Sequence, residues 1–419
     1  MKSKDLHTEG RGRSSISLYG DNLNNHFFIT EIEEFAQRYQ VVYVFLRYGI
    51  GEPKHSEEIH RLPNVTVLDL SVQRSARAWK PITFLLYLFR LLPWKKVFDV
   101  ASMKAAIVNA AIGWRTACQV PQSGLRSHFH LSFWGRSPEF LVALKSMNPE
   151  YVVGTRLHSF DLYFSLATKL QLSTRLKALN ALDFVAPISV HGANHLKAHG
   201  VTTLSRVSYL GCRANEFLFL FKEQRSAKKS SECLKIATIA KVAPVKRLDY
   251  TVDVLNRLGS RVVWHQYGRL SINEKDTDHV NLVRNKVRKS NSKRRRLEMK
   301  GDVSNEELRK ALIDEKYDFV LLLSESEGVP VSLMEALAAD IRIVVTDTNG
   351  CSELVQNDIG CLIPVEASVA ECAHRIEQWL DELSGTPHDG LALDFWKSRF
   401  DSAVLYDDFV EFVDSLPVK

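Results

Sequence analysis

Two glutamates, Glu327 and Glu335, lie eight residues apart in the sequence, downstream of a short apolar run. The run, residues 318–323, predicts a buried parallel strand, and the helix formers at 331–339 predict a helix after a tight loop. A strand, a loop and a helix N-terminus form an anion site, because the first helical N–H groups and the positive end of the helix dipole point at the same place. We therefore expect Glu327 to reach one end of a long anionic ligand and Glu335 to accept hydrogen bonds from sugar hydroxyls.

The spacing of these glutamates, with Glu327-Gly-Val-Pro330 inside it, resembles the donor-site signature of retaining glycosyltransferases of family 4. The segments 341–355 and 357–364 agree with that pattern, and the resemblance covers nearly all of the chain from Arg156 onward. It implies an α/β protein with the GT-B fold, in which two Rossmann-like doubly wound domains face each other across a cleft. It also implies retaining transfer of a sugar from a nucleotide-sugar donor, without a metal or another cofactor.

The resemblance assigns roles to residues of the second domain. The loop 241–249 resembles the family's diphosphate-binding loop, in which Lys246 matches a lysine and Lys241 replaces an arginine. In the implied donor site Glu327 is a catalytic residue that orients the sugar. The diphosphate is bound by Lys241, Lys246 and the N–H groups of Val331 and Ser332. Glu335 contacts the ribose and Val303 the nucleobase.

A second motif lies in the first half of the chain, where a predicted strand runs into Arg156-x-His158-x-x-Asp161-Leu-Tyr. This resembles the family's first-domain motif and implies that His158 is catalytic and reaches the donor sugar from the other wall. Alternating strands and helices predict a doubly wound parallel sheet there, and ligands of such sheets bind beyond the carboxyl ends of the strands. We therefore place Asn22, Asn24 and Asp161 on the acceptor side.

The length of 419 residues predicts two domains, each large enough for its own core. The expected boundaries are a flexible leader at 1–13, an acceptor-binding domain at 14–220, a linker at 221–232, a nucleotide-sugar-binding domain at 233–390, and terminal helices at 391–419 that cross back to the first domain.

Cysteine usage and polar runs limit the other ligand classes. The six cysteines include no Cys-x-x-Cys pair, which argues against a zinc site or a disulfide framework and fits a reducing cytosol. Asp276-x-Asp278 matches a metal-binding pattern but lacks its context, so we expect no metal. The basic run Lys293–Arg296 has no nucleic-acid-binding motif around it, and we expect it on the solvated face of a helix, with no nucleic acid as partner.

The segment Trp79–Lys96 is apolar nearly all round, too short to span a bilayer, and framed by tryptophans and lysines. Residues 71–138 contain ten lysines or arginines and one acid. This pattern is typical of a membrane interface, although a buried helix is an equally open interpretation. The polar N-terminus has no signal peptide, so we expect a cytoplasmic protein, peripheral at the inner face of the membrane, that is attracted to anionic lipid.

These observations predict a retaining glycosyltransferase that moves a sugar to a saccharide acceptor, lipid-linked in our interpretation, in surface polysaccharide or lipopolysaccharide biosynthesis. The alternative is a catalytically weak GT-B protein that acts as a scaffold in a polysaccharide assembly complex. Lys241, Arg269 and Ser159, which depart from the family motifs, motivate that alternative. A dinucleotide-dependent oxidoreductase is disfavoured, because no Gly-x-Gly-x-x-Gly follows any predicted strand.

Overall fold

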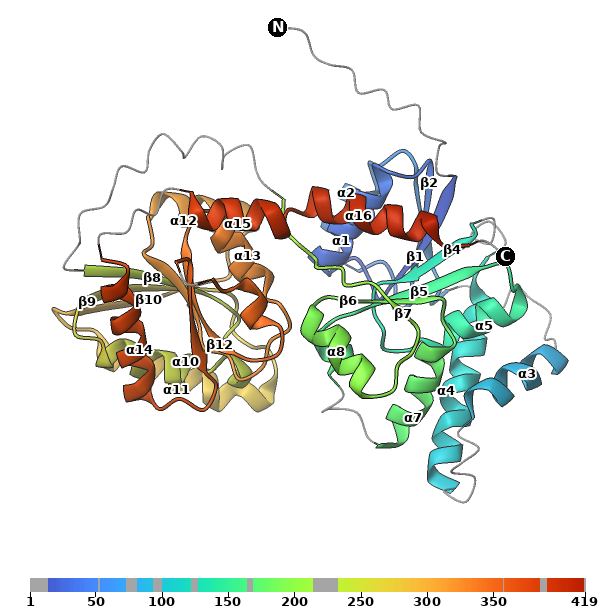
Figure 1. The fold of residues 1–419 in the computed structure, drawn as a ribbon, viewed down its shortest axis with the longest axis horizontal. Helices are drawn as coiled ribbons and strands as arrows, with labels where there is room; N and C mark the ends of the chain where they lie inside the picture. The colour runs from blue at the N-terminus through green and yellow to red at the C-terminus, as the bar shows by residue number, and fades with distance from the viewer. Residues whose placement is uncertain are drawn as a thin grey trace, which may run out of the picture. The chain divides into compact units, whose positions relative to one another are not determined.

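The computed structural model describes residues 14–51, 53–72, 81–92, 100–121, 127–163, 169–213, 233–356, 358–384 and 390–417. They form two compact units, coloured from blue to red along the chain in Figure 1. Unit 1 holds the described residues up to Ile188, those of 193–208 and those from Tyr406 onward, and unit 2 holds 189–192 and 209–405. The predicted leader (1–13) and linker (221–232) lie outside the described residues.

Unit 1 is built on a seven-stranded parallel sheet with the order β3-β2-β1-β4-β5-β6-β7. Both faces of the sheet are covered, and all six residues of β5 are buried, as expected for a doubly wound sheet. The strands are β1 (Ser15–Gly20), β2 (Val41–Leu46), β3 (Val65–Asp69), β4 (Phe129–Ser132), β5 (Val152–Leu157), β6 (Phe184–Pro187) and β7 (Leu204–Ser205).

The helices of unit 1 connect successive strands. The first of them begins after Asn25, whose side chain accepts the N–H groups of Phe27 and Phe28, and it buries Ile32 and Phe35 against the sheet. The helices are α1 (His26–Ala36), α2 (Pro53–His60), α3 (Pro81–Leu91), α4 (Val100–Gln119), α5 (Glu139–Met147), α6 (Ser159–Leu162), α7 (Lys169–Asn180) and α8 (Val190–Ala198), the first residues of α8 belonging to unit 2.

Unit 2 repeats the same strand order in a six-stranded parallel sheet, β10-β9-β8-β11-β12-β13. In both units the order reverses between the first and the fourth strand, which is the point at which open α/β sheets bind ligands. The strands are β8 (Cys233–Ile239), β9 (Arg261–Tyr267), β10 (Arg295–Gly301), β11 (Phe319–Leu322), β12 (Arg342–Asp347) and β13 (Gly360–Pro364).

Helices cover both faces of the second sheet (Figure 1). On one face, Trp264 is fully buried in an apolar cluster with residues of α10, α11 and α14, and its Nε1 donates to Thr238 Oγ1 at 2.9 Å. The described helices are η5 (Pro244–Lys246), α10 (Leu248–Arg257), η6 (Glu274–Asp276), α11 (Thr277–Ser290), α12 (Asn305–Asp314), α13 (Val331–Ala338), η7 (Cys351–Leu354), α14 (Val369–Glu382), α15 (Leu391–Arg399) and α16 (Ser402–Ser415).

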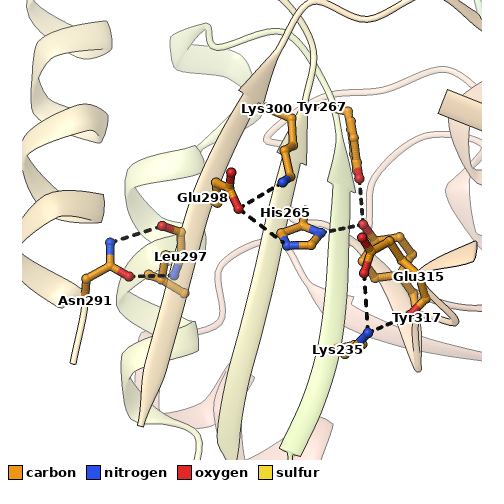
Figure 2. Close-up of polar contacts among 9 residues, drawn as sticks. All are labelled: Lys235, His265, Tyr267, Asn291, Leu297, Glu298, Lys300, Glu315 and Tyr317. Atoms are coloured by element: carbon orange, nitrogen blue, oxygen red, sulfur yellow. Dashed lines mark hydrogen bonds and ion pairs between the residues drawn. The ribbon is translucent and has the colours of Figure 1, made fainter. Parts of the chain in front are cut away.

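The basic run Lys293–Arg296 does not lie on a helix, contrary to our expectation, because its last two residues begin strand β10. The side chain of Asn291 explains this local structure, since it pairs with both backbone groups of Leu297, at 2.8 and 3.1 Å (Figure 2). Arg295 is buried, and its Nη1 donates to the carbonyl of Ser260 at 2.6 Å.

A polar network around His265 and Tyr267 ties the strands of unit 2 together (Figure 2). The hydroxyl of Tyr317 lies 2.7 Å from His265 Nδ1 and 2.7 Å from the hydroxyl of Tyr267. Beside it, Lys300 pairs with Glu298 at 2.9 Å. Burial is the largest cause of the lowered pKa of His265, so a neutral imidazole is favoured there. The network joins β9 to the end of β10, after which residues 302–304 follow.

Helix α3 shows which interpretation of the segment Trp79–Lys96 fits its described part. Ile82, Leu85, Leu86 and Phe89 form a stripe that is between 63% and 74% exposed, while Tyr87 is buried. The buried-helix interpretation therefore fails for this stripe; Trp79, Trp94 and Lys96 lie outside the described residues. No helix in the described part of the chain has the length and hydropathy that a membrane span requires.

Candidate functional site

Glu327 and Lys246 form an ion pair at the carboxyl end of the second sheet. Lys246 Nζ lies 2.5 Å from Glu327 Oε1, and the hydroxyl of Ser324 donates to the same oxygen at 2.6 Å. The Lys246 side chain keeps 20% of its surface accessible, and the Glu327 side chain keeps 10%. The pair is therefore partly desolvated, which strengthens its electrostatic interactions. It is still accessible to a ligand.

Side chains from the next strand, β12, and from the loop after it hold the Glu327 loop in place. Thr346 donates to the carbonyl of Ser324 at 2.5 Å, and Asn349 Nδ2 donates to the carbonyl of Glu327 at 2.6 Å. Asn349 has φ +49°, a left-handed position that asparagine tolerates. The sequence interpretation missed Ser324 and Thr346 as supporting residues, because short hydroxyl side chains near strand ends carry no distinctive pattern.

Lys246 and Lys241 occupy the same loop, and only Lys246 meets Glu327. Lys246 ends η5, and Arg247, at φ +48°, turns the chain into α10. Lys241 is exposed, at the start of the loop. Val242 forms a parallel bridge with Leu270, so Lys241 and the exposed Arg269 are neighbours at the same edge of the sheet. Arg269 therefore places a second positive charge beside Lys241, whereas the resemblance led us to expect Lys241 alone.

Helix α13 begins beside Glu327 without a side-chain cap. Pro330 is the N-cap residue, and its carbonyl accepts the N–H of Leu333 at 3.1 Å. Among the described residues, the N–H groups of Val331 and Ser332 have no acceptor. These two donors, the dipole of α13 and the ammonium of Lys246 together favour a bound anion.

Glu335 lies one turn further along α13, in a small cavity with Cys212 and Arg309. Burial raises the pKa of Glu335, and the positive charge of Arg309 opposes that rise. Arg309, on α12, is a residue that the sequence interpretation did not single out. Val303 is half-buried and precedes Ser304, the N-cap residue of α12. The contacts of Glu335 with a ribose and of Val303 with a nucleobase stay predictions.

His158 is buried at the end of β5 in unit 1. Its Nε2 lies 2.8 Å from the carbonyl of Phe133, so Nε2 carries the proton and Nδ1 is the acceptor atom. Burial, reinforced by the charge of Arg156, lowers the pKa of His158 to about 3. The ring is also packed against Phe133 and Trp134. A neutral imidazole of this kind orients or accepts a hydrogen bond but is a weak general base.

The residues predicted on the acceptor side are local supports of their loops. The Asp161 carboxylate accepts the N–H groups of Gly135 and His158, both at 2.5 Å, and burial raises its pKa to about 7. Asn22 Oδ1 accepts the N–H of Asn24 at 3.0 Å in the loop after β1. Their contact with an acceptor stays a prediction.

Asp276 is part of a local turn. Its Oδ2 accepts the hydroxyl of Ser271 at 2.6 Å, at the start of α11. This contact explains the residue without a metal, and metal independence itself stays a prediction.

Comparisons with known proteins identify the region that contains the Lys246–Glu327 pair. Residues 221–385 match the family described as Glycosyl transferases group 1. The chain is 29% identical over 217 residues to the putative colanic acid biosynthesis glycosyltransferase WcaL of Salmonella typhimurium, which is 50% of this chain and 49% of WcaL. It is 34% identical over 67 residues to the O-antigen biosynthesis glycosyltransferase WbnH of Escherichia coli, which is 16% of this chain and 19% of WbnH. The matched regions thus span about half of WcaL and a fifth of WbnH.

Solved structures establish the fold over nearly the whole chain. Anabaena HepE in complex with UDP and glucose matches with a TM-score of 0.67 at 14% identity, over 96% of this chain and all of HepE. The lipopolysaccharide outer core galactosyltransferase WaaB matches with a TM-score of 0.63 at 12% identity, over 96% of this chain and 99% of WaaB. The predicted fold class, two Rossmann-like parallel-sheet α/β units of the GT-B type, is confirmed.

Proposed function

We propose that the protein is a retaining glycosyltransferase of family 4 that transfers a sugar from a nucleotide-sugar donor to a lipid-linked saccharide acceptor in surface polysaccharide or lipopolysaccharide biosynthesis. The observation that carries the proposal is the Lys246–Glu327 pair beside the open N-terminus of α13, inside the segment that matches group 1 glycosyl transferases. Unit 2 binds the donor in this proposal, and unit 1 binds the acceptor.

The contacts of unit 2 suit a nucleoside diphosphate. Lys246 and the N–H groups of Val331 and Ser332 stabilise the negative charge that builds on the diphosphate as the bond from the sugar to its oxygen breaks. Glu327 is fixed by Ser324 and Lys246, so its carboxylate can orient sugar hydroxyls. Glu335, in the next turn, holds the ribose. Lysine and helix N–H groups supply the positive charge, so we expect activity to persist in a chelator.

Retention follows from the face of the sugar on which the acceptor attacks. In the proposed reaction the new bond forms on the face that the diphosphate leaves, and a diphosphate oxygen takes the proton of the acceptor hydroxyl. This route needs no protein general base, which agrees with the low pKa of His158. NMR of the product would show the anomeric configuration of the donor sugar, whereas an inverted product would refute this part of the proposal.

The exposed apolar stripe of α3 supports a membrane-bound acceptor. Ile107 and Val108 on the neighbouring α4 are also about half exposed, and Arg90 and Lys104 lie among these apolar residues. Each cation near an anionic bilayer contributes ~1 kcal/mol of attraction. We expect the protein to sediment with anionic vesicles more than with neutral ones, and Leu86→Ser with Phe89→Ser to lose most of that binding. A native protein that stays unbound with both vesicles would refute the membrane part.

A panel of nucleotide sugars tests the donor assignment. A donor that binds only the folded protein must raise its melting temperature, and the native protein should respond to one sugar and base above the others. Glu327→Gln, which keeps the size of the side chain, should bind the nucleotide and lose transfer. If no nucleotide sugar shifts the melting temperature, the scaffold alternative is favoured and the proposal fails.

A further inference from the structure

Unit 1 contains a cavity of about 590 Å³ at the carboxyl ends of its central strands. Three arginines of the described residues line it: Arg47 after β2, Arg136 after β4 and Arg175 on α7. A cavity of this size accommodates a small ligand or the head of a larger one. The function proposed above assigns no ligand group to these arginines.

Arg47 is the innermost of the three cations. Its guanidinium lies 4.1 Å from the centre of the Phe140 ring, and Nη2 is shielded from solvent without a hydrogen-bond partner among the described residues. A buried guanidinium N–H without an acceptor is costly, and a ligand oxygen would remove that cost. Burial also lowers the pKa of Arg47, with the charge of Asp21 opposing this effect.

Arg136 and Arg175 bring two further charges to the cavity. Arg136 lies between Trp134 and Phe160, about 5 Å from each ring centre, and its Nη1 is 3.6 Å from Asp21 Oδ2. Arg175 donates from Nη2 to the carbonyl of Asp161. These contacts hold both guanidinium groups in place, and those of Arg136 leave some of its N–H groups available for a ligand.

Among the described residues of the lining, Glu139 carries the one carboxyl group that opposes the charge of the arginines. Glu139 is buried, and burial raises its pKa. With Asp21, which lies beside Arg136, these groups sum to a net positive charge of one, or of two when Glu139 is protonated. An anion with one or two negative charges would match this site.

The cavity opens beside the apolar surface of α3 and α4. Ile112 on α4 lines the cavity and is 56% exposed, one turn after the exposed Ile107 and Val108. Tyr87 on α3 donates to the carbonyl of Ala110 on α4 at 2.9 Å, which joins the exposed stripe of α3 to the same surface. A ligand with an anionic head and an apolar tail would contact both.

We propose that Arg47, Arg136 and Arg175 bind the phosphate group of the lipid-linked acceptor, whose apolar tail lies along α3 and α4. The identification of the ligand as the acceptor rests on the proposed function, whereas the phosphate site itself depends only on residues of unit 1. Arginine suits phosphate because its planar N–H groups bind two oxygens at once.

The test compares soluble probes by isothermal titration with the native protein: octyl phosphate, octyl glucoside and inorganic phosphate. We expect octyl phosphate to bind at least about tenfold tighter than octyl glucoside, because the arginines require an anion, and tighter than inorganic phosphate, because α3 and α4 require an apolar tail. Equal binding of octyl phosphate and octyl glucoside would overturn the phosphate site. Equal binding of inorganic phosphate would overturn the lipid part.

Variants assign the effect to the cavity. Arg47→Met and Arg136→Gln should each weaken octyl phosphate binding at least about tenfold. Arg47→Lys, which keeps the charge, should recover part of the binding, and Arg136 is exposed, so its replacement leaves the fold intact. Arg61→Met is the matched control: Arg61 is exposed before β3, at the opposite edge of the same sheet, and its loss should change binding less than twofold.

Donor binding separates this inference from the proposed function. If nucleotide sugars do not bind but octyl phosphate binds through Arg47, the proposed function fails and the phosphate site stands. If transfer occurs and Arg47→Met uses a phosphate-bearing acceptor as well as the native protein does, the phosphate site is wrong and the proposed function stands.

Discussion

The two sheets have the same strand order at their centres but use their charged residues differently. In unit 2, the Lys246–Glu327 pair keeps 20% and 10% of its side-chain surface accessible at the end of the sheet. In unit 1, the Arg156–Glu31 pair is fully buried. Arg156 belongs to the motif that resembles a functional one, yet its contacts are internal. The comparison shows that a charged residue within a functional motif serves stability when tertiary contacts surround it.

The buried pair joins three separate parts of unit 1. Arg156 Nη1 donates to the carbonyl and the hydroxyl of Ser208, at 3.0 and 2.9 Å, and its guanidinium lies 4.4 Å from the centre of the Phe409 ring. Tyr406 donates to Glu31 at 3.1 Å. These contacts hold the last part of α16 against β5 and α1.

The largest effect should come from breaking this buried pair. Arg156→Met leaves Glu31 without its partner in an apolar site, and we expect the free energy of unfolding to fall by about 3–5 kcal/mol. Guanidinium unfolding followed by fluorescence measures the change. Adding Glu31→Gln should recover part of the loss, because the lone carboxyl is then removed. A loss below about 1 kcal/mol would mean that the pair is not structural.

Breaking the Lys246–Glu327 pair should instead reduce catalysis and change stability little. Lys246→Met should lower kcat at least about 100-fold, roughly 2.7 kcal/mol, because the charge that Lys246 meets grows in the transition state. The melting temperature should change little, since the side chain is partly exposed. Lys241→Met is the control from the same loop, and we expect less than a tenfold change there. Equal effects of the two variants would contradict the distinction between the lysines.

Glu335 tests whether its cavity on α13 holds part of the donor. Glu335→Gln should weaken donor binding roughly thirtyfold, about 2 kcal/mol, because a charged acceptor of hydrogen bonds is lost. Bound-state chemistry should change less than about threefold, since ribose contacts are present before and during the reaction. Glu306→Gln, on the exposed surface of α12, is the matched control. An unchanged donor KM in Glu335→Gln would refute the ribose assignment.

The smallest effect concerns the pH dependence of unit 1. His158 has a folded pKa of about 3, below the ordinary value of 6.5, so the unfolded chain binds its proton first as the pH falls. The stability of the native protein relative to His158→Gln should therefore be constant above about pH 7.5 and should fall by about 1.4 kcal/mol between about pH 7.5 and about pH 5.5. Unfolding of both proteins at the two pH values measures this difference. A constant difference would mean that the imidazole is solvated.

The sequence alone determined the local parts of the donor region. Apolar strands, the Gly- and Pro-containing loop and the helix formers after Glu327 are consecutive, so their geometry follows from periodicity and backbone preference. Asp340, at φ +54°, and Asn349, at φ +49°, are residue types that tolerate the left-handed positions they occupy. Reasoning from the local sequence failed at Lys293–Arg296, where the pairing of Asn291 with Leu297 decided between helix and strand.

Only the tertiary structure decided which charged residues form pairs and whether each pair is exposed or buried. Lys246 and Glu327 are 81 residues apart, and Arg156 and Glu31 are 125 residues apart, so their pairing depends on the order of strands in each sheet. Among the three arginines of the unit 1 cavity, Arg47 and Arg136 follow strands and Arg175 lies on α7, and they share no sequence motif. The parallel sheet brings Arg47 and Arg136 together, because the carboxyl ends of its strands lie at one edge, and the packing of α7 in unit 1 adds Arg175.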